Sequence, residues 1–116
     1  MISREHRFHG LGSLRHVYRL GRTVRGPLFG VKILLNERRR TYRASVVVSR
    51  KINKSAVARN RMRRRLYELV RELGTEIDRP YDIVITVFNS GVADAPLERL
   101  RAQLKEQLHQ AGVIHK

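Results

Sequence analysis

A long run of basic side chains without any acid is the part of this sequence most able to bind a ligand. Between Glu37 and Glu68 the chain carries twelve Lys and Arg residues, and no Asp or Glu interrupts them. They are Arg38, Arg39, Arg40, Arg43, Arg50, Lys51, Lys54, Arg59, Arg61, Arg63, Arg64 and Arg65. Arginine predominates, and its planar guanidinium can donate two parallel hydrogen bonds to a phosphate. Because a merely solvated surface mixes charges of both signs, the run predicts a surface that binds a polyanion.

The densest part of this run falls on a predicted helix. Counted at about 100° per residue, Asn60, Arg61 and Arg64 point away from the apolar stripe of that helix. Arg59 and Arg63 fall near the stripe, where a charged side chain cannot enter a core, so we expect them to project toward a groove or a partner. The alternative is a pair of Arg side chains that only extend to water. The first turn of the helix also offers unpaired N–H groups and a positive dipole end, which favour phosphate.

Side chains that could form a catalytic or metal site of the protein's own are scarce. The sequence has no cysteine, and the only acids in residues 1–65 are Glu5 and Glu37. His6 and His9 have the spacing of a metal-binding pair but lack two further ligands. Residues 10–13 superficially resemble a phosphate loop, but no strand precedes them and no Lys-Ser or Lys-Thr follows. We therefore expect neither a catalytic residue nor a metal ligand in this chain.

The positive charge is concentrated in the first half of the 116 residues, whose net charge is +15. Residues 1–65 hold 19 basic and 2 acidic side chains, whereas residues 66–116 hold 6 basic and 8 acidic ones. Hydrophobic residues make up 41% of the chain, which predicts one folded domain over residues 1–116, with residues 1–10 as a mobile tail. No apolar stretch has the length of a membrane span or a signal peptide, which predicts a cytoplasmic protein.

Hydrophobic periodicity predicts six elements in the order α-β-β-α-β-α. They are a short helix capped by Ser13 and stopped by Gly21, strands over residues 28–35 and 42–49, a long helix from its cap Ser55 to Leu73, a strand over residues 81–88, and a final helix that begins near Asp94. The predicted apolar stripes are Met62, Leu66, Leu69, Val70 and Leu73 on the long helix, and Leu97, Leu100, Leu104 and Leu108 on the last. We expect the first two strands to pair as a hairpin.

Residues 49–64 resemble the signature of the protein component of bacterial ribonuclease P. They read Ser49-Arg50-Lys51, a four-residue spacer, Ala56-Val57-Ala58, and then Arg59-Asn60-Arg61-Met62-Arg63-Arg64. The flanks are similar too, with an early helix before Gly21-Arg22 and a strand that begins Tyr81-Asp82-Ile83-Val84. The resemblance covers residues 4–112. It implies an α/β (α+β) two-layer sandwich, related to a ribosomal-protein domain, with a left-handed βαβ crossover around the basic helix.

This resemblance implies the protein subunit of a ribonucleoprotein endonuclease that trims the 5′ leader from precursor tRNA. The RNA subunit would catalyse the cleavage with Mg²⁺ that the RNA itself holds, and the protein would bind without cleaving. The implied partners are the catalytic RNA and precursor tRNA, with no membrane and no DNA. By resemblance, the residues that contact the catalytic RNA are Arg50, Lys51, Arg59, Asn60, Arg61, Arg63 and Arg64.

The resemblance places the single-stranded leader in a cleft between the first helix and the sheet, with Leu14, Tyr18 and Lys32 as its contacts. Tyr18 stands near Arg15 and Arg19, and proteins hold single-stranded RNA by stacking its bases on aromatic rings in a basic groove. Tyr18 could equally be a core residue whose hydroxyl is satisfied, and Lys32 could simply face solvent. The family commonly has two aromatics on its first helix and an aromatic at the position of Lys32, so this chain departs from the pattern there.

Two other functions fit the same composition. A structural ribosomal protein, or another RNA-binding protein without a processing role, would also be small, basic and free of cysteine, and only the motif at residues 59–64 argues against it. A DNA-binding regulator would use residues 55–73 as a recognition helix. That arrangement requires a preceding helix and a tight turn, whereas a strand is predicted before this helix.

Overall fold

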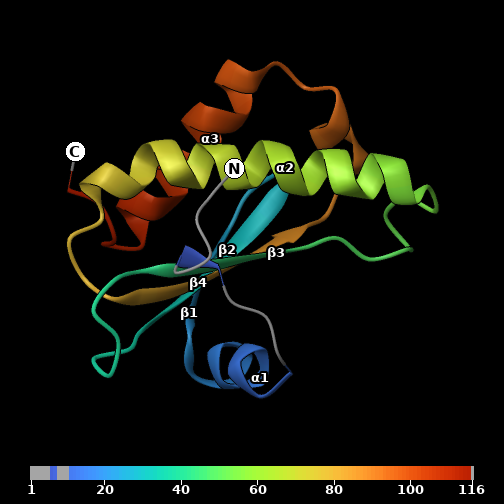
Figure 1. Cartoon of the computed structure of the whole chain (residues 1–116). Helices are drawn as coiled ribbons and strands as arrows, with labels where there is room; N and C mark the ends of the chain where they lie inside the picture. The colour runs from blue at the N-terminus through green and yellow to red at the C-terminus, as the bar shows by residue number, and fades with distance from the viewer. Residues whose placement is uncertain (1–5, 8–10, 116) are drawn as a thin grey trace.

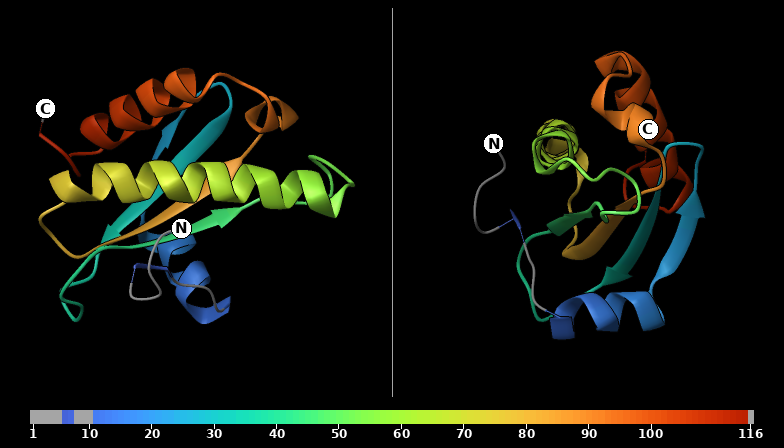
Figure 2. Two further views of the ribbon diagram at one scale, coloured as in Figure 1. Left: turned by 45° about the horizontal axis from the view of Figure 1, so that its top comes forward. Right: turned by 90° about the vertical axis from the view of Figure 1, so that its right-hand side faces the viewer.

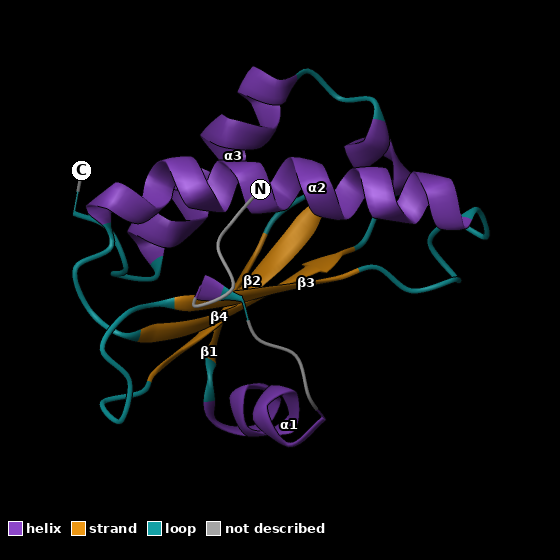
Figure 3. Cartoon of the chain, in the orientation of Figure 1, coloured by secondary structure: helices purple, strands orange, loops and turns teal. Residues whose placement is uncertain are grey.

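The computed structural model describes residues 6–7 and 11–115, with no account of the side chains of residues 11–13. A four-stranded sheet separates one helix from two others (Figures 1 and 3). In chain order the elements are α1 (Leu11–Leu20), β1 (Arg22–Arg25), β2 (Phe29–Leu35), β3 (Arg43–Val47), α2 (Ala56–Leu73), η2 (Gly74–Glu76), β4 (Tyr81–Val87), η3 (Ser90–Ala93) and α3 (Leu97–Gln110). The mixed α+β fold expected from the sequence is confirmed.

The predicted pairing of the first two long strands is wrong. The sheet order is β1-β2-β4-β3, so β4 lies between β2 and β3. β4 runs antiparallel to β2, with Phe29 opposite Val87, and parallel to β3. The physical reason lies in β4 itself: Ile83, Val84 and Ile85 are all fully buried, so this strand is apolar on both faces and gains most from a central position. The β3–α2–β4 segment is consequently a parallel crossover that carries the basic helix.

The hairpin that does form joins β1 and β2, and the sequence analysis missed its first strand. Arg22 pairs with Ile33 and Arg25 pairs with Gly30. β1 has four residues and only Val24 is apolar, so it lacks the alternating pattern that identifies a strand in a sequence. Charged residues are common on such short edge strands, because they discourage pairing with other chains.

Helices α2 and α3 cover one face of the sheet, and α1 covers part of the other (Figure 2). The bounds predicted for α2 are confirmed, since Ser55 caps it and its Oγ accepts a hydrogen bond from the amide of Ala58 at 3.2 Å. All five residues of its predicted stripe are buried: Met62, Leu66, Leu69, Val70 and Leu73. In α3, Leu100, Leu104 and Leu108 are fully buried. Leu97 is 39% exposed, because it is the first residue of α3 and no preceding turn of this helix covers it.

The beginning of the chain differs from expectation in two ways. Helix α1 begins at Leu11, so Ser13 is the third residue of the helix and the predicted start after Ser13 is wrong. His6 and Arg7, which fall in the segment expected to be a mobile tail, make contacts: Arg7 forms a parallel bridge with Ala44, and the His6 ring stacks on Tyr42. The rest of residues 1–10 lies outside the described residues. No helix in the described part of the chain is long and apolar enough to cross a membrane.

Candidate nucleic-acid interface

The loop between β3 and α2 is held against the first turn of the helix. The amide of Ser55 donates to the side-chain oxygen of Asn53 at 2.9 Å. A guanidinium nitrogen of Arg59 donates to the backbone oxygens of Asn53 and Lys54, at 2.9 and 3.0 Å. Arg59 therefore positions the loop that carries Arg50 and Lys51, both of which are exposed. Its own guanidinium is only partly available for an external contact.

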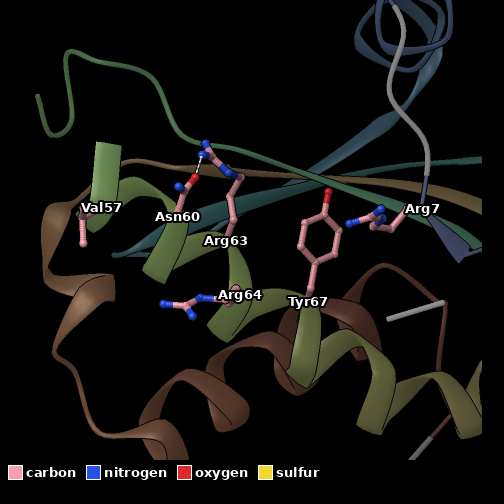
Figure 4. A pocket seen from close by; sticks show the side chains of 6 residues that line it. All are labelled: Arg7, Val57, Asn60, Arg63, Arg64 and Tyr67. Carbon is pink, nitrogen blue, oxygen red and sulfur yellow. Dashed lines mark hydrogen bonds between the residues drawn. The ribbon is translucent and has the colours of Figure 1, made fainter. Parts of the chain in front are cut away.

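Three of the expected RNA-contacting residues come together on one face of α2. Asn60, Arg63 and Arg64 line a pocket of about 500 Å³ whose other lining residues are Arg7, Val57 and Tyr67 (Figure 4). A guanidinium nitrogen of Arg63 donates to the side-chain oxygen of Asn60, which orients both side chains. Arg64 is exposed. We call this set of six residues the α2 pocket.

Arg61 points to a different side of the helix from the α2 pocket. Its Nε donates to the backbone oxygen of Ala93 at 2.7 Å, so it contacts the segment between β4 and α3. The side chain is nevertheless exposed, and its two terminal nitrogens remain available as donors. The structure therefore separates Arg61 from the α2 pocket.

Two other members of the basic run have hydrogen-bond partners within the protein. Arg65 donates to the backbone oxygens of Val92, at 2.6 Å, and Ala95. Burial lowers the pKa of Arg65, with a further lowering by Arg61. Arg43 forms a bidentate ion pair with the buried Asp82, both N–O distances being 2.9 Å. The basic run is thus a mixture of surface cations and fold-stabilising side chains, and spacing in the sequence does not distinguish them.

The residues expected to hold a leader lie on the opposite face of the sheet, at α1 (Figure 2). The Nζ of Lys32 donates to the backbone oxygen of Tyr18 at 2.7 Å and lies 5.8 Å from the centre of its ring. Tyr18 is 40% exposed, which decides against the alternative of a core tyrosine. Leu14 instead packs against the buried pair Val17 and Val84. Of the three residues expected to contact the leader, Leu14 is therefore the one whose main contact is with the sheet.

A contact between a cation and an aromatic ring, which the sequence analysis did not select, joins β1 to the residue after β4. The guanidinium carbon of Arg25, on β1, lies 4.7 Å from the centre of the Phe88 ring.

The close approach of α1 to the sheet depends on Gly21, since a Cβ there would come within 2.6 Å of the Val17 oxygen and 2.9 Å of the Ile33 oxygen. At these distances any side chain would clash with the backbone, so the position requires glycine.

Among the described residues, no group of three or more His, Cys, Asp or Glu side chains is placed to hold a metal ion. His9, which has the spacing of a metal ligand from His6, lies outside the described residues. His6 stacks on the Tyr42 ring with centres 4.1 Å apart, and its Nδ1 is 2.9 Å from the backbone oxygen of Tyr42.

Comparison with known proteins decides which family has this arrangement. The family model "Ribonuclease P" matches residues 2–112. This chain belongs to the ribonuclease P protein family. The ribonuclease P protein component of Chloroflexus aurantiacus is 38% identical over 113 residues, covering 97% of this chain and 82% of the relative. That of a Pseudanabaena strain is 34% identical, covering 99% of this chain and 98% of the relative.

The fold agrees with the family as well. The structure of the RNase P protein of Staphylococcus aureus superposes with a TM-score of 0.83 at 23% identity, covering 95% of this chain and 98% of that one. A second structure with the same score is a mutant of the S. aureus protein with defective mRNA degradation activity. The ribonuclease P resemblance of residues 49–64, and the α+β fold that it implied, are therefore confirmed.

Proposed function

We propose that this chain is the protein subunit of a ribonuclease P holoenzyme in the cytoplasm, and that it binds the catalytic RNA and the 5′ leader of precursor tRNA. The observation that carries the proposal is the α2 pocket in a chain of the ribonuclease P family. Its lining combines the side chains of Asn60, Arg63 and Arg64 on an exposed helix face. We assign this face to the RNA subunit.

The chemistry of the α2 pocket suits a phosphate backbone. Its lining includes three guanidinium groups and no carboxylate, so an anion meets no repulsion there. Phosphate contacts from Arg are short and charge-assisted. They fix the position and orientation of a protein on a nucleic acid without reading its sequence. This face would therefore recognise the shape of a folded RNA by the placing of its phosphates.

The α1 face suits a single strand. An exposed aromatic ring with an ammonium group beside it offers a stacking surface for a base and a charge for the adjacent phosphate. Tyr18 and Lys32 provide this combination, and the exposed Arg15 and Arg19 flank it on α1. We assign the leader to this face, so that the protein holds the two RNA molecules on opposite sides of its sheet.

In this proposal the RNA subunit holds Mg²⁺ and catalyses the hydrolysis, and the protein is not catalytic by itself. Neighbouring phosphates repel one another in a folded RNA, and cations of either kind reduce that repulsion. A protein with a net charge of +15 takes over part of this screening. We therefore expect the protein to lower the Mg²⁺ concentration that the RNA subunit needs.

The test is reconstitution with a transcribed bacterial ribonuclease P RNA and a precursor tRNA that carries a 5′ leader. At low Mg²⁺ the RNA alone should cleave little, and addition of the protein should restore cleavage at the 5′ end of the tRNA. The Arg64→Ala variant should require a higher protein concentration for the same rate. A protein that binds the RNA but leaves the Mg²⁺ requirement unchanged would favour the alternative of a structural RNA-binding protein.

A control without the RNA subunit tests whether the protein cleaves by itself. It should contain highly purified protein, precursor tRNA and, because the S. aureus protein is associated with mRNA degradation activity, a messenger RNA. We expect no cleavage of either substrate. A second sample of the same protein is purified under denaturing conditions and refolded, which removes contaminating nucleases. Cleavage that persists in this refolded sample would contradict the non-catalytic role.

A further inference from the structure

Arg7, which lies outside the basic run between Glu37 and Glu68, supplies a cation to the α2 pocket. Arg7 pairs with Ala44 at the outer edge of β3, next to the stack of His6 on Tyr42. These contacts place His6 and Arg7 beside a helix that follows them by about fifty residues. Figure 4 shows the Arg7 side chain directed toward Tyr67, one of the residues of α2 that line the pocket.

The floor of the pocket near Arg7 is fixed by the same strand. The hydroxyl oxygen of Tyr67 accepts a hydrogen bond from the amide of Val46 at 3.1 Å, two residues along β3 from the partner of Arg7. The guanidinium carbon of Arg7 lies 6.0 Å from the centre of the Tyr67 ring. β3 contacts both the Tyr67 hydroxyl and the backbone of Arg7. The Arg7 guanidinium is therefore positioned beside the Tyr67 ring before any ligand binds.

One nitrogen of Arg7 is buried without a partner. Its Nε has lost contact with solvent and has no hydrogen-bond partner among the described residues. Such groups are rare in folded proteins, because a desolvated donor without an acceptor destabilises the fold. Arg7 also lines the α2 pocket, so an acceptor bound there would meet a guanidinium group whose hydrogen bonding within the protein is incomplete.

We infer that Arg7, Arg63 and Arg64 form, with the side-chain amide of Asn60, a site for one phosphodiester group of the RNA backbone. One non-bridging oxygen would accept from Arg7 and the other from the guanidinium groups of α2. The hydrogen bond from Arg63 to the Asn60 oxygen leaves the Asn60 NH₂ group as a further donor. This inference rests on the proposed function, and it extends the RNA-binding face of α2 to Arg7.

The experiment measures affinity for a transcribed bacterial ribonuclease P RNA over a range of salt concentrations. Arg7→Gln removes the charge and keeps much of the side chain, whereas Arg7→Lys keeps the charge without the guanidinium. Lys105→Ala, which removes one positive charge from the exposed side of α3, is the matched control. Circular dichroism and thermal melts establish that each variant is folded.

Arg7→Gln should weaken binding about tenfold and make the plot of log K against log salt shallower by about one, the contribution of one phosphate contact. Arg7→Lys should retain the wild-type slope with a smaller loss of affinity. Lys105→Ala should change neither quantity beyond a small uniform effect of net charge.

Each other result overturns the inference in a distinct way. If Arg7→Gln binds like the wild type while Arg64→Ala binds weakly, Arg7 is not part of the site, and the proposed function stands. If both variants bind like the wild type, the assignment of the α2 face to RNA is itself wrong. A loss of affinity in Arg7→Gln without a change of slope would show that Arg7 only holds the N-terminal segment on β3.

Discussion

Arg64 and Arg65 are adjacent on α2 and have the same side chain, yet the structure gives them different surroundings. Arg64 is exposed and lines the α2 pocket. Arg65 is half-buried and donates to the backbone oxygens of Val92 and Ala95, which fastens the segment before α3 to α2. We predict that Arg64→Ala lowers the RNA affinity with little change in the free energy of unfolding. Arg65→Ala should mainly lower the free energy of unfolding.

The expected loss for Arg65→Ala follows from its two hydrogen bonds. A hydrogen bond to a charged group contributes about 1.5 to 3 kcal/mol when it is buried. Because Arg65 is only half-buried, water replaces part of both bonds in the variant, and we expect a total loss of about 2 kcal/mol in the free energy of unfolding. At roughly 2.1 cal/mol/K per residue, a chain of this length has an unfolding entropy near 0.24 kcal/mol/K, so the melting midpoint should fall by about 8 °C.

The expected effect of Arg64→Ala is the reverse. A substitution at an exposed site without a structural partner changes stability by no more than about 0.5 kcal/mol, which corresponds to about 2 °C here. The loss of a charge-assisted contact to a phosphate should weaken RNA binding by about 1 to 3 kcal/mol. That range is a factor of roughly 5 to 150 in the dissociation constant.

Thermal melts followed by circular dichroism and filter binding to the RNA subunit measure the two quantities on the same protein samples. Binding is measured well below the midpoint of the Arg65→Ala variant, so that both variants are fully folded in the assay. If Arg65→Ala melts within 2 °C of the wild type, the two carbonyl contacts do not stabilise the fold as we argue. If Arg64→Ala loses as much stability as its neighbour, the assignment of Arg64 to the pocket surface is wrong.

Three further predictions concern the α1 face, the basic surface and the contact between α2 and α3. Tyr18→Ala should reduce the affinity for precursor tRNA relative to mature tRNA by about 1 to 3 kcal/mol, the loss of one stacked base; equal losses for both RNAs would mean that the ring does not contact the leader. Sulfate, compared with chloride at fixed ionic strength, should raise the melting midpoint, because an anion that binds only the folded state stabilises it. At an anion concentration of a hundred times the dissociation constant, the free energy of unfolding rises by about 2.7 kcal/mol. Equal midpoints would count against a clustered site. Glu72 accepts two hydrogen bonds from Arg101, at 2.8 and 3.2 Å, and this contact lowers its pKa. Its stabilisation is therefore present above the pKa of the unfolded chain and is lost as the pH falls through the lower folded value. Glu72→Gln should melt slightly below the wild type at neutral pH and together with it in acid, and a difference that persists in acid would refute this origin.

The parts of the fold that were predictable from the sequence are those set by local signals. Helix α2 is the clearest example, because its cap Ser55 and its apolar stripe both lie within the helix or next to it. The strand order was not predictable in this way. β4 is apolar on both faces, but its pairing with β2 and with β3 joins residues that are distant in the chain. No local signal therefore shows that β4 lies between two strands that are neighbours in the sequence.

The site shows the same division between local and distant information. Asn60, Arg63 and Arg64 were selected because they belong to one short motif on α2. The helix geometry had instead grouped Asn60 with Arg61, and only the structure brings Arg63 into the same pocket. Arg65 was indistinguishable from them in the basic run, since its partners Val92 and Ala95 come after β4. Arg7 carried no signal at all, because its place in the pocket depends on a bridge to Ala44 at the edge of a distant strand.

The central position of β4 has a consequence for the protein during its synthesis. β2 and β3 emerge before the strand that joins them, since Phe29 pairs with Val87. Until then residues 1–65, with 19 basic and 2 acidic side chains, have no complete sheet to arrange them, and an unfolded chain of that charge binds any RNA through its phosphates. We expect the nascent basic half to adhere to RNA without discrimination. Selectivity for one RNA would begin only when the acidic second half has been translated and β4 has entered the sheet.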